Sequence, residues 1–145
     1  MRAGETADVV VVGGGPAGSA AASLLARAGW SVTILERAVP PRPKPCGECV
    51  NPGAVAALRR IGMLDAVLAL SPATIQGWWL KSDGVDATGD FPADAEPGLG
   101  VARDRLDAAL LSEARRHRAS VEEGVSRTVA ALSELRGCLP AGRSS

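Results

Sequence analysis

Three glycines and one glutamate have the types and the spacing needed to hold a diphosphate and a ribose. Gly13, Gly15 and Gly18 follow a run of valines, and Glu36 lies eighteen residues after the last glycine. The first glycine can make a tight turn, the second leaves the backbone open to a pyrophosphate, and the third permits close helix packing. The Glu36 carboxylate can accept hydrogen bonds from a ribose 2′-hydroxyl, whereas it would repel a 2′-phosphate. The pattern therefore predicts a site for a dinucleotide whose adenosine carries no 2′-phosphate.

The residues around these glycines predict the elements that position them. Residues 7–12 are rich in valine, as expected for a strand covered on both faces, and residues 16–28 predict a helix of small and aliphatic residues. Pro16 is compatible with a first helical turn, whose N–H groups have no carbonyl partners inside the helix and can face a phosphate. A second strand at residues 31–35 ends just before Glu36. This order predicts a dinucleotide-binding βαβ unit, with a glycine turn in an ordinary βα unit as the alternative.

The run from Val11 to Ala22 resembles the N-terminus of FAD-dependent oxidoreductases. More narrowly, it resembles the glutathione-reductase-like flavoproteins, which include aromatic-ring monooxygenases, flavin halogenases and geranylgeranyl reductases. Pro16 and Ala17, between the second and third glycines, are typical of FAD rather than NAD members. The resemblance implies an α/β fold: a Rossmann-like FAD-binding βαβ domain with a parallel sheet and a small antiparallel β-insertion. The cofactor-binding residues that it implies in this stretch are Gly13, Gly15, Pro16, Ala17, Gly18, Glu36 and Arg37.

A proline-rich segment follows the second strand and predicts a loop. Residues 38–52 contain five prolines, so a helix or a central strand is excluded there. Within this loop, residues 44–48 (Lys-Pro-Cys-Gly-Glu) are similar to a loop that runs alongside the flavin in reductase-like and monooxygenase-like members. The resemblance implies that the backbone at Cys46 and Gly47 touches the cofactor and that Cys46 or Glu48 faces the active-site cavity. A solvated loop is the alternative.

Residues 103–118 predict a helix whose first residue has a charge that the helix dipole disfavours. Its apolar face consists of Leu106, Leu110 and Ala114. Arg103 at the start is unfavourable unless a phosphate or carboxylate is nearby. The pattern Arg-x-x-Leu-Asp-x-x-Leu resembles a second FAD-contacting element, in which the arginine reaches the flavin or its pyrophosphate region. A surface ion pair between Arg103 and Asp107, one turn later, is the alternative.

The end of this helix leads to one more strand. Residues 119–124 match a strand that, in the relatives, lies beside the first strand and leads to the adenine. Backbone groups near Val125 are therefore expected to meet the adenine ring. His117, flanked by arginines, is expected to be solvated.

The middle of the chain predicts two short helices and an antiparallel insertion. The helices are expected at residues 52–60, capped by Asn51, and at residues 64–70. A strand at 75–81, a turn at 82–84 and a strand at 85–91 form the insertion, and residues 90–100 are expected to be loop. Of the tryptophans at 78 and 79, one is expected to pack inward and one to be partly exposed; lining a substrate pocket is the alternative.

Composition limits the classes of partner and location. The 145 residues suit one domain, and a formal net charge of zero offers no basic field for nucleic acid or a membrane surface. The uncharged stretch 9–26 contains glycines and a proline, so it predicts a strand and a turn rather than a membrane span. The start lacks the features of a signal peptide, which makes the cytoplasm the expected location. Cys46 and Cys49 have CxxC spacing but lack a second pair, so they are expected to be loop cysteines without a metal.

The resemblance covers residues 8–125 and then stops. Full-length relatives continue with a later Gly-Asp motif that holds the ribityl chain and diphosphate, and residues 126–145 contain no such motif. The expected organisation is an N-terminal portion of an FAD-binding domain at 1–125, with insertion strands at 75–91, and a loose tail at 126–145. The chain is therefore expected to be truncated, with an exposed sheet edge that favours self-association or a partner that supplies the missing C-terminal half.

These patterns favour the N-terminal FAD-binding portion of an FAD-dependent oxidoreductase. In that chemistry the flavin takes a hydride from NAD(P)H and then reacts with O₂ or reduces an alkene of a small organic substrate. No catalytic residue is assigned. The first alternative is a truncated, non-catalytic remnant that binds ADP or FAD. The second, an NAD dehydrogenase, is disfavoured by Pro16, Ala17 and the 44–48 loop.

Overall fold

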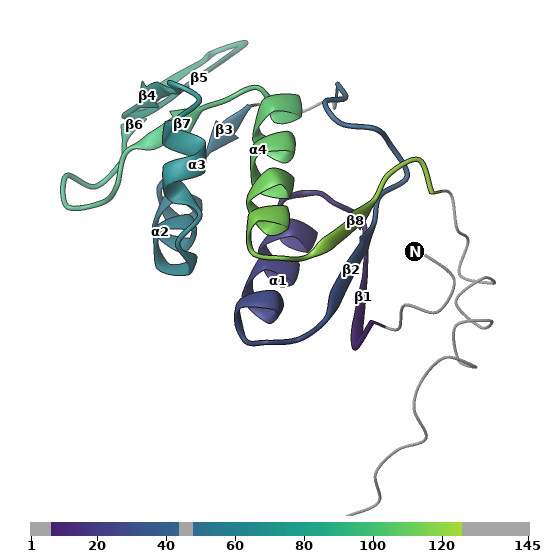
Figure 1. Cartoon of the computed structure of the whole chain (residues 1–145). Helices are drawn as coiled ribbons and strands as arrows, with labels where there is room; N and C mark the ends of the chain where they lie inside the picture. The colour runs from purple at the N-terminus through teal and green to yellow at the C-terminus, as the bar shows by residue number, and fades with distance from the viewer. Residues whose placement is uncertain (1–6, 44–47, 126–145) are drawn as a thin grey trace, which may run out of the picture.

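The computed structural model describes residues 7–43 and 48–125, and the structural statements below concern these residues. Their strands are β1 (Val9–Val12), β2 (Val32–Leu35), β3 (Cys49–Val50), β4 (Ala73–Ile75), β5 (Gly77–Ser82), β6 (Val85–Asp90), β7 (Gly98–Gly100) and β8 (Ser120–Glu122). Their helices are α1 (Pro16–Arg27), α2 (Pro52–Ile61), α3 (Leu64–Leu68) and α4 (Arg103–Arg116). The fold is mixed α/β with a parallel sheet (Figure 1), which confirms the predicted fold class.

The parallel sheet has the strand order β1-β2-β8. Val9 pairs with Val32, and Thr33 pairs with Ser120, so β2 occupies the centre. All four residues of β2 are buried, as its continuous apolar run requires of a central parallel strand. The expectation that residues 119–124 lie beside the first strand is wrong: β8 pairs with β2. The apolar pattern predicts a parallel strand here, but pairing to β2 comes from the crossover of α4, which the pattern does not encode.

Helix α4 joins two separate apolar clusters. Leu111 and Ala114 pack with Val32 and Ile34 beneath the parallel sheet. Leu106 and Leu110, one turn earlier, belong to a second cluster that α2, α3, β3 and β7 complete. The predicted apolar face of this helix is confirmed, since its residues are at most 6% exposed. Figure 1 shows that α4 lies between α1 and the α2–α3 pair. Its side chains can therefore contribute to both clusters.

The first turn of helix α1 lies so close to the preceding turn that only glycine fits at position 18. Gly13 has φ of +99°, which suits the tight bend after β1. A Cβ at Gly18 would lie 2.0 Å from the Gly13 carbonyl oxygen. The third glycine of the motif is therefore needed for contact between the helix and the turn, as the spacing predicts.

A polar contact holds the far ends of α1 and α4 together. Ser23 is fully buried, and its Oγ lies 2.6 Å from Nδ1 of His117. His117 is half-buried, so the expectation of a solvated histidine is wrong. The close packing of α1 on α4 brings Ser23 to the end of α4. The arginines beside His117 in the sequence favoured a solvated histidine and did not indicate this contact. Glu113 lies one turn before His117, and its hydrogen bond from Arg116 lowers the pKa of its carboxyl group.

A small antiparallel sheet has the order β3-β7-β4. Two predicted loops contain its strands: β3 lies inside residues 38–52, and β7 lies inside 90–100. The glycines of β7 favoured a loop in the sequence. A Cβ added at Gly98 would lie 3.0 Å from the Phe91 ring, so a larger residue there would require the ring to shift. The single strand predicted at 75–81 is also wrong. It breaks at Gln76, so that β4 pairs with β7 and β5 pairs with β6.

Helix α2 follows its predicted cap. Asn51 Oδ1 accepts a hydrogen bond from the N–H of Ala54 at 2.8 Å, which caps α2. Gly62 ends α2 in the left-handed conformation, with φ of +73°. Helix α3 ends two residues before its predicted limit.

The β5–β6 hairpin turns at Gly84, which has φ of +75°, and confirms the predicted antiparallel return. Trp78 and Trp79 are 54% and 66% exposed, so the expectation that one of them packs inward is wrong. In a two-stranded sheet, successive side chains point to opposite faces. Within the described residues neither face is covered by another layer. Every helix in the described part of the chain falls short of the length and apolarity that a bilayer crossing requires.

We expect Gly18→Ala to lower the free energy of unfolding by about 3 kcal/mol, because the new methyl group would overlap a backbone carbonyl that cannot move aside. Urea unfolding followed by circular dichroism measures the change. Gly53→Ala, in the first turn of α2, is the matched control: its Cβ would meet only Asn51 Oδ1 at 3.5 Å. A Gly18→Ala protein as stable as the control would contradict the close approach.

We expect Glu113 to contribute stability at neutral pH that is lost in acid. Its folded pKa lies below the ordinary value of 4.5, so its contribution is present above pH 4.5 and disappears as the pH falls through the folded pKa. Glu113→Gln should therefore be less stable than the unmodified chain at pH 7, and the difference should shrink below pH 4.5. Thermal unfolding at several pH values tests this, with Asp83→Asn in the exposed hairpin turn as the control. A constant difference across pH would contradict it.

Candidate nucleotide-binding site

The carboxyl ends of the three parallel strands meet at one edge of the sheet. The N–H of Gly13, after β1, donates to the Leu35 carbonyl at 2.9 Å. The N–H of Glu36, after β2, donates to the Glu122 carbonyl at 2.8 Å, and the N–H of Val125 donates to the Glu36 carbonyl at 3.1 Å. The structure thus brings together Gly13, Glu36 and Val125, three of the predicted site residues. Ligands of open α/β sheets bind at this edge.

Glu36 is buried and bridges two backbone segments. Its residue surface is 6% exposed. Oε2 accepts a hydrogen bond from the N–H of Gly14 at 2.6 Å, and Oε1 accepts one from the N–H of Ala38 at 2.9 Å. The Arg42 guanidinium is also near, with Nε 3.9 Å from Oε1. The carboxylate therefore fixes the glycine turn to the end of β2, and a carboxylate can accept about four hydrogen bonds in all.

The first turn of α1 points toward this edge without a side-chain cap. Gly15 is the N-cap residue, with extended backbone angles, and no side-chain hydrogen bond caps the helix. Pro16 is the first helical residue, and the first helical hydrogen bond runs from Ser19 N to Gly15 O at 2.8 Å. Such a helix start presents N–H groups and the positive end of the dipole to an anion. The geometry can therefore hold a phosphate.

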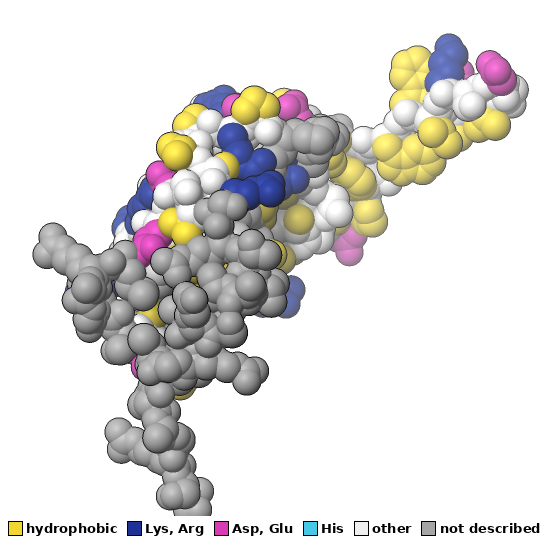
Figure 2. Space-filling view, turned by 90° about the vertical axis from the view of Figure 1, so that its right-hand side faces the viewer, with side chains coloured by type: hydrophobic (Ala, Val, Ile, Leu, Met, Phe, Trp, Pro, Cys, Tyr) yellow, Lys and Arg dark blue, Asp and Glu magenta, His cyan; other side chains and the backbone are white. Residues whose placement is uncertain are grey.

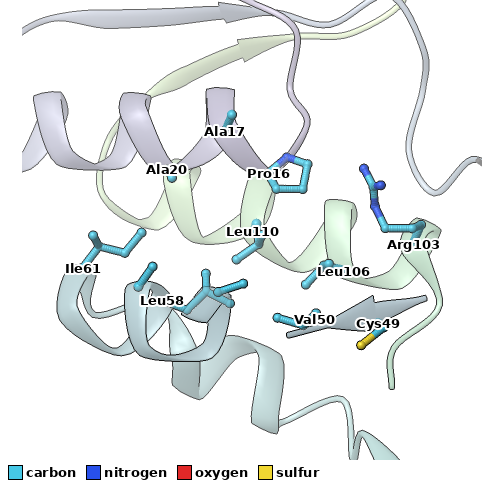
Figure 3. Close-up of a pocket in the computed structure, with 12 residues that line it drawn as sticks. Pro16, Ala17, Ala20, Cys49, Val50, Leu58, Ile61, Arg103, Leu106 and Leu110 are labelled. Carbon is cyan, nitrogen blue, oxygen red and sulfur yellow. The ribbon is translucent and has the colours of Figure 1, made fainter. Parts of the chain in front are cut away.

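A cavity of about 350 Å³ adjoins the start of α1 and lies between α1, α2, α4 and β3 (Figure 3). Its walls are almost entirely apolar. The lining residues are Pro16, Ala17, Ala20, Cys49, Val50, Ala54, Ala57, Leu58, Ile61, Arg103, Leu106 and Leu110. Arg103 is the one charged residue among them, and Figure 3 shows it extending from the start of α4 on the side where Pro16 lies.

Arg103 forms an ion pair and also lines the cavity. Its Nε donates to Oδ1 of Asp107 at 3.0 Å, so the ion-pair alternative from the sequence is observed. Asp107 is buried, which makes the pair more than a surface contact. Pro16 and Ala17 line the same cavity as Arg103. The Arg103 guanidinium is therefore held in place near the start of α1.

The other predicted site residues differ in what the structure says of them. Cys46 and Gly47 lie outside the described residues. Arg37 is exposed, next to Glu36. Glu48 is also exposed and does not line the cavity, whereas Cys49, which the sequence pattern did not favour, does.

Sequence reasoning missed two residues that build the glycine turn, Gly14 and Ser19. The N–H of Gly14 binds Glu36, and a Cβ at Gly14 would lie 3.0 Å from Leu111 Cδ1 and 3.3 Å from the Glu36 Cβ. Ser19 is fully buried and donates from Oγ to the Gly14 carbonyl at 3.1 Å. The three consecutive glycines could have indicated that Gly14 is also constrained, but the GxGxxG motif allows any residue at this middle position.

Comparison with known proteins gives relatives that are several times longer than this chain. The menaquinone reductase of Mycobacterium tuberculosis strain H37Rv is 43% identical over 107 residues, which cover 74% of this chain and 26% of the reductase. Squalene monooxygenase SE2 of Panax ginseng is 31% identical over 145 residues, 93% of this chain and 25% of that protein. The chain thus spans about a quarter of the length of these curated relatives.

Solved flavoproteins share the fold. A flavoprotein/dehydrogenase from Cytophaga hutchinsonii matches with a TM-score of 0.77 and 34% identity, over 86% of this chain and 31% of that one. The myxobacterial chondrochloren halogenase, described as a variant of FAD-dependent halogenases, matches with a TM-score of 0.73 and 31% identity, over 83% and 29%. The family model described as "FAD binding domain" matches residues 6–135. The chain therefore belongs to the FAD binding domain family.

Proposed function

We propose that this chain binds FAD, with the ADP half at the carboxyl edge of the parallel sheet. One observation carries the proposal: the uncapped start of α1 faces a glycine turn that the buried Glu36 holds in place. The diphosphate lies against the first-turn N–H groups, the ribose hydroxyls donate to Glu36, and the adenine lies near Val125.

The residues of the turn suit this group. Gly13 takes a backbone conformation that side chains disfavour, and Gly18 has no room for a Cβ, so no side chain from either position fills the space before α1. Direct N–H bonds to charged phosphate oxygens are among the stronger hydrogen bonds in proteins. We also propose cofactor contacts from Gly15, Pro16 and Ala17. Contacts from Arg37, Cys46 and Gly47 are proposed on the resemblance alone.

The apolar cavity and Arg103 give the second half of the proposed site. Bound FAD supplies hydride-transfer chemistry, and the protein supplies position and a dry environment. Arg103, held by Asp107, places a positive charge where the flavin or its pyrophosphate region is expected. The aliphatic side chains of α2 and α4 give the cavity an apolar lining.

We further propose that the chain forms the N-terminal FAD-binding portion, residues 1–125, of a cytoplasmic oxidoreductase in the glutathione-reductase-like group. Its electron donor is NAD(P)H and its substrate a small organic molecule. The higher identity to menaquinone reductases than to squalene monooxygenases favours reduction over oxygen insertion. A C-terminal portion equivalent to the rest of these relatives completes the enzyme.

A non-catalytic ADP- or FAD-binding protein is the second candidate. It requires only the glycine turn and the buried Glu36, and no catalytic group. Both candidates share the nucleotide site, so they differ in turnover rather than in binding.

We expect calorimetry to show binding of ADP and FAD and much weaker binding of 2′,5′-ADP, because the Glu36 carboxylate repels a 2′-phosphate. Glu36→Gln should weaken ADP binding about tenfold or more, since a hydrogen bond to a charged group is lost. Glu123→Gln, which removes a partly exposed carboxylate paired with Arg115, is the control. Thermal unfolding of each variant separates lost binding from a loosened glycine turn. Equal affinity of the Glu36→Gln and control proteins for ADP would contradict the site.

We expect the FAD-loaded chain to oxidise NADH no faster than free FAD does, because catalysis in its relatives belongs to much longer chains. Absorbance at 340 nm, with and without added quinone, follows the reaction. Rapid turnover by this chain would show that it is a complete catalyst and would contradict the need for a C-terminal portion.

A further inference from the structure

The buried side of helix α1 carries two serines one turn apart. Ser19 and Ser23 are both fully buried, and residues four apart lie on the same face of a helix, about 6 Å apart along its axis. Ser19 Oγ donates to the Gly14 carbonyl in the glycine turn at 3.1 Å, and Ser23 Oγ lies 2.6 Å from His117 Nδ1 at the end of α4. The two hydroxyls therefore connect α1 to the glycine turn and to α4.

A carboxylate lies beside the other nitrogen of the His117 ring. Nε2 is 3.8 Å from Oε1 of Glu113, one turn earlier in α4, and Arg116 Nε donates to Oε2 of Glu113 at 3.0 Å. The side chains of His117 and Glu113 are 19% and 11% exposed. With Ser23 at Nδ1 and Glu113 near Nε2, both ring nitrogens face polar partners, which fixes the orientation of the imidazole.

The side chains that α1 buries are small. Its fully buried residues are Ser19, Ala22 and Ser23. Small side chains let two helices approach closely, but they are too short to interlock and so do little to fix the register of one helix along the other. A hydrogen bond depends on distance and direction. The Ser23–His117 hydrogen bond can therefore set a register that alanine contacts alone would leave loose.

We propose that Ser23 and His117 are positioning residues for the diphosphate, an inference that rests on the proposed function. Pro16 at the start of α1 and Arg103 at the start of α4 line the same cavity, so their separation depends on how α1 lies against α4. The Ser23–His117 hydrogen bond fixes this arrangement nearer the opposite ends of the two helices. Neither residue contacts the ligand. The pair keeps the first-turn N–H groups of α1 and the Arg103 guanidinium at the spacing that a diphosphate needs.

The pair acts on one half of the ADP group. The proposed ribose and adenine contacts, Glu36 and Val125, are held by backbone hydrogen bonds between the ends of β2 and β8. The phosphates instead meet the start of α1. A shift of α1 along α4 therefore weakens the binding of ADP and spares adenosine, which has no phosphate. A general loosening of the fold would weaken both.

The test compares the affinities for ADP, by calorimetry, and for adenosine, by NMR titration. Ser23→Ala and His117→Leu should each raise the Kd for ADP about fivefold or more and change the Kd for adenosine less than about twofold. The double variant should lose no more than either single variant, because each removes the same hydrogen bond. His117→Asn, whose side-chain amide can replace Nδ1, should restore the ADP affinity to within about twofold of the unmodified chain.

Two control variants lie outside the contact. Leu24→Ala shortens the neighbouring side chain of α1, which is 44% exposed. Lys81→Ala lies on the β5–β6 hairpin, which projects from the body of the molecule in Figure 2. Both controls should bind ADP and adenosine as the unmodified chain does.

A further measurement on the untagged, unmodified chain needs no variant. His117 is the single histidine of the sequence, so its imidazole NMR signals are unambiguous. Coupling between two sites is reciprocal: if the Ser23–His117 contact affects ADP affinity, ADP must also affect the contact. We expect ADP to shift the imidazole signals, and we expect Ser23→Ala to remove most of this shift.

Unchanged ADP affinity in Ser23→Ala and His117→Leu would overturn the inference and leave the proposed function standing. An equal loss of ADP and adenosine affinity would also overturn it, because the contact would then serve the fold alone. Imidazole signals that ADP does not move would have the same consequence. Failure of the unmodified chain to bind ADP would overturn the proposed function itself, and this inference with it.

Discussion

The buried hydrogen bond from the Gly14 N–H to the Glu36 carboxylate is the constraint on which the candidate site depends. A buried carboxylate must be satisfied by donors, and here the donors are backbone N–H groups on either side of it, at Gly14 and Ala38. The same two hydrogen bonds fix the position of the glycine turn relative to the end of β2. An acid that the sequence assigns to a ribose thus also builds the glycine turn before α1.

Sequence reasoning predicted the β1–α1–β2 unit and helix α2 best. There the signals are local: a valine run, glycines at fixed spacing, a proline at a helix start and the Asn51 cap. What it could not predict was set by long-range pairing. The neighbour of β8, the short strand β3 and the division of residues 73–82 between two sheets all depend on which backbone groups remain to be paired. The side-chain pattern carries no record of that.

The candidate site shows the same division. Gly13, Glu36 and Val125 were expected to act together, and the three strand ends place them together. Cys49 at the cavity and the Ser23–His117 contact were missed, because each needs two elements that lie far apart in the chain. For Arg103 the sequence offered a place near the cofactor or an ion pair with Asp107. The ion pair is observed, and it holds Arg103 beside the cavity.

Helix α4 gives leucines from adjacent turns to two different apolar clusters, one under the parallel sheet and one under the antiparallel strands. A helix shared in this way couples the melting of the two halves, since neither cluster survives the loss of its common wall. Arg103, Leu106 and Leu110 place the same helix along the cavity. A ligand bound in this cavity would contact the helix that both clusters share. Its binding would therefore stabilise both parts of the molecule rather than one alone.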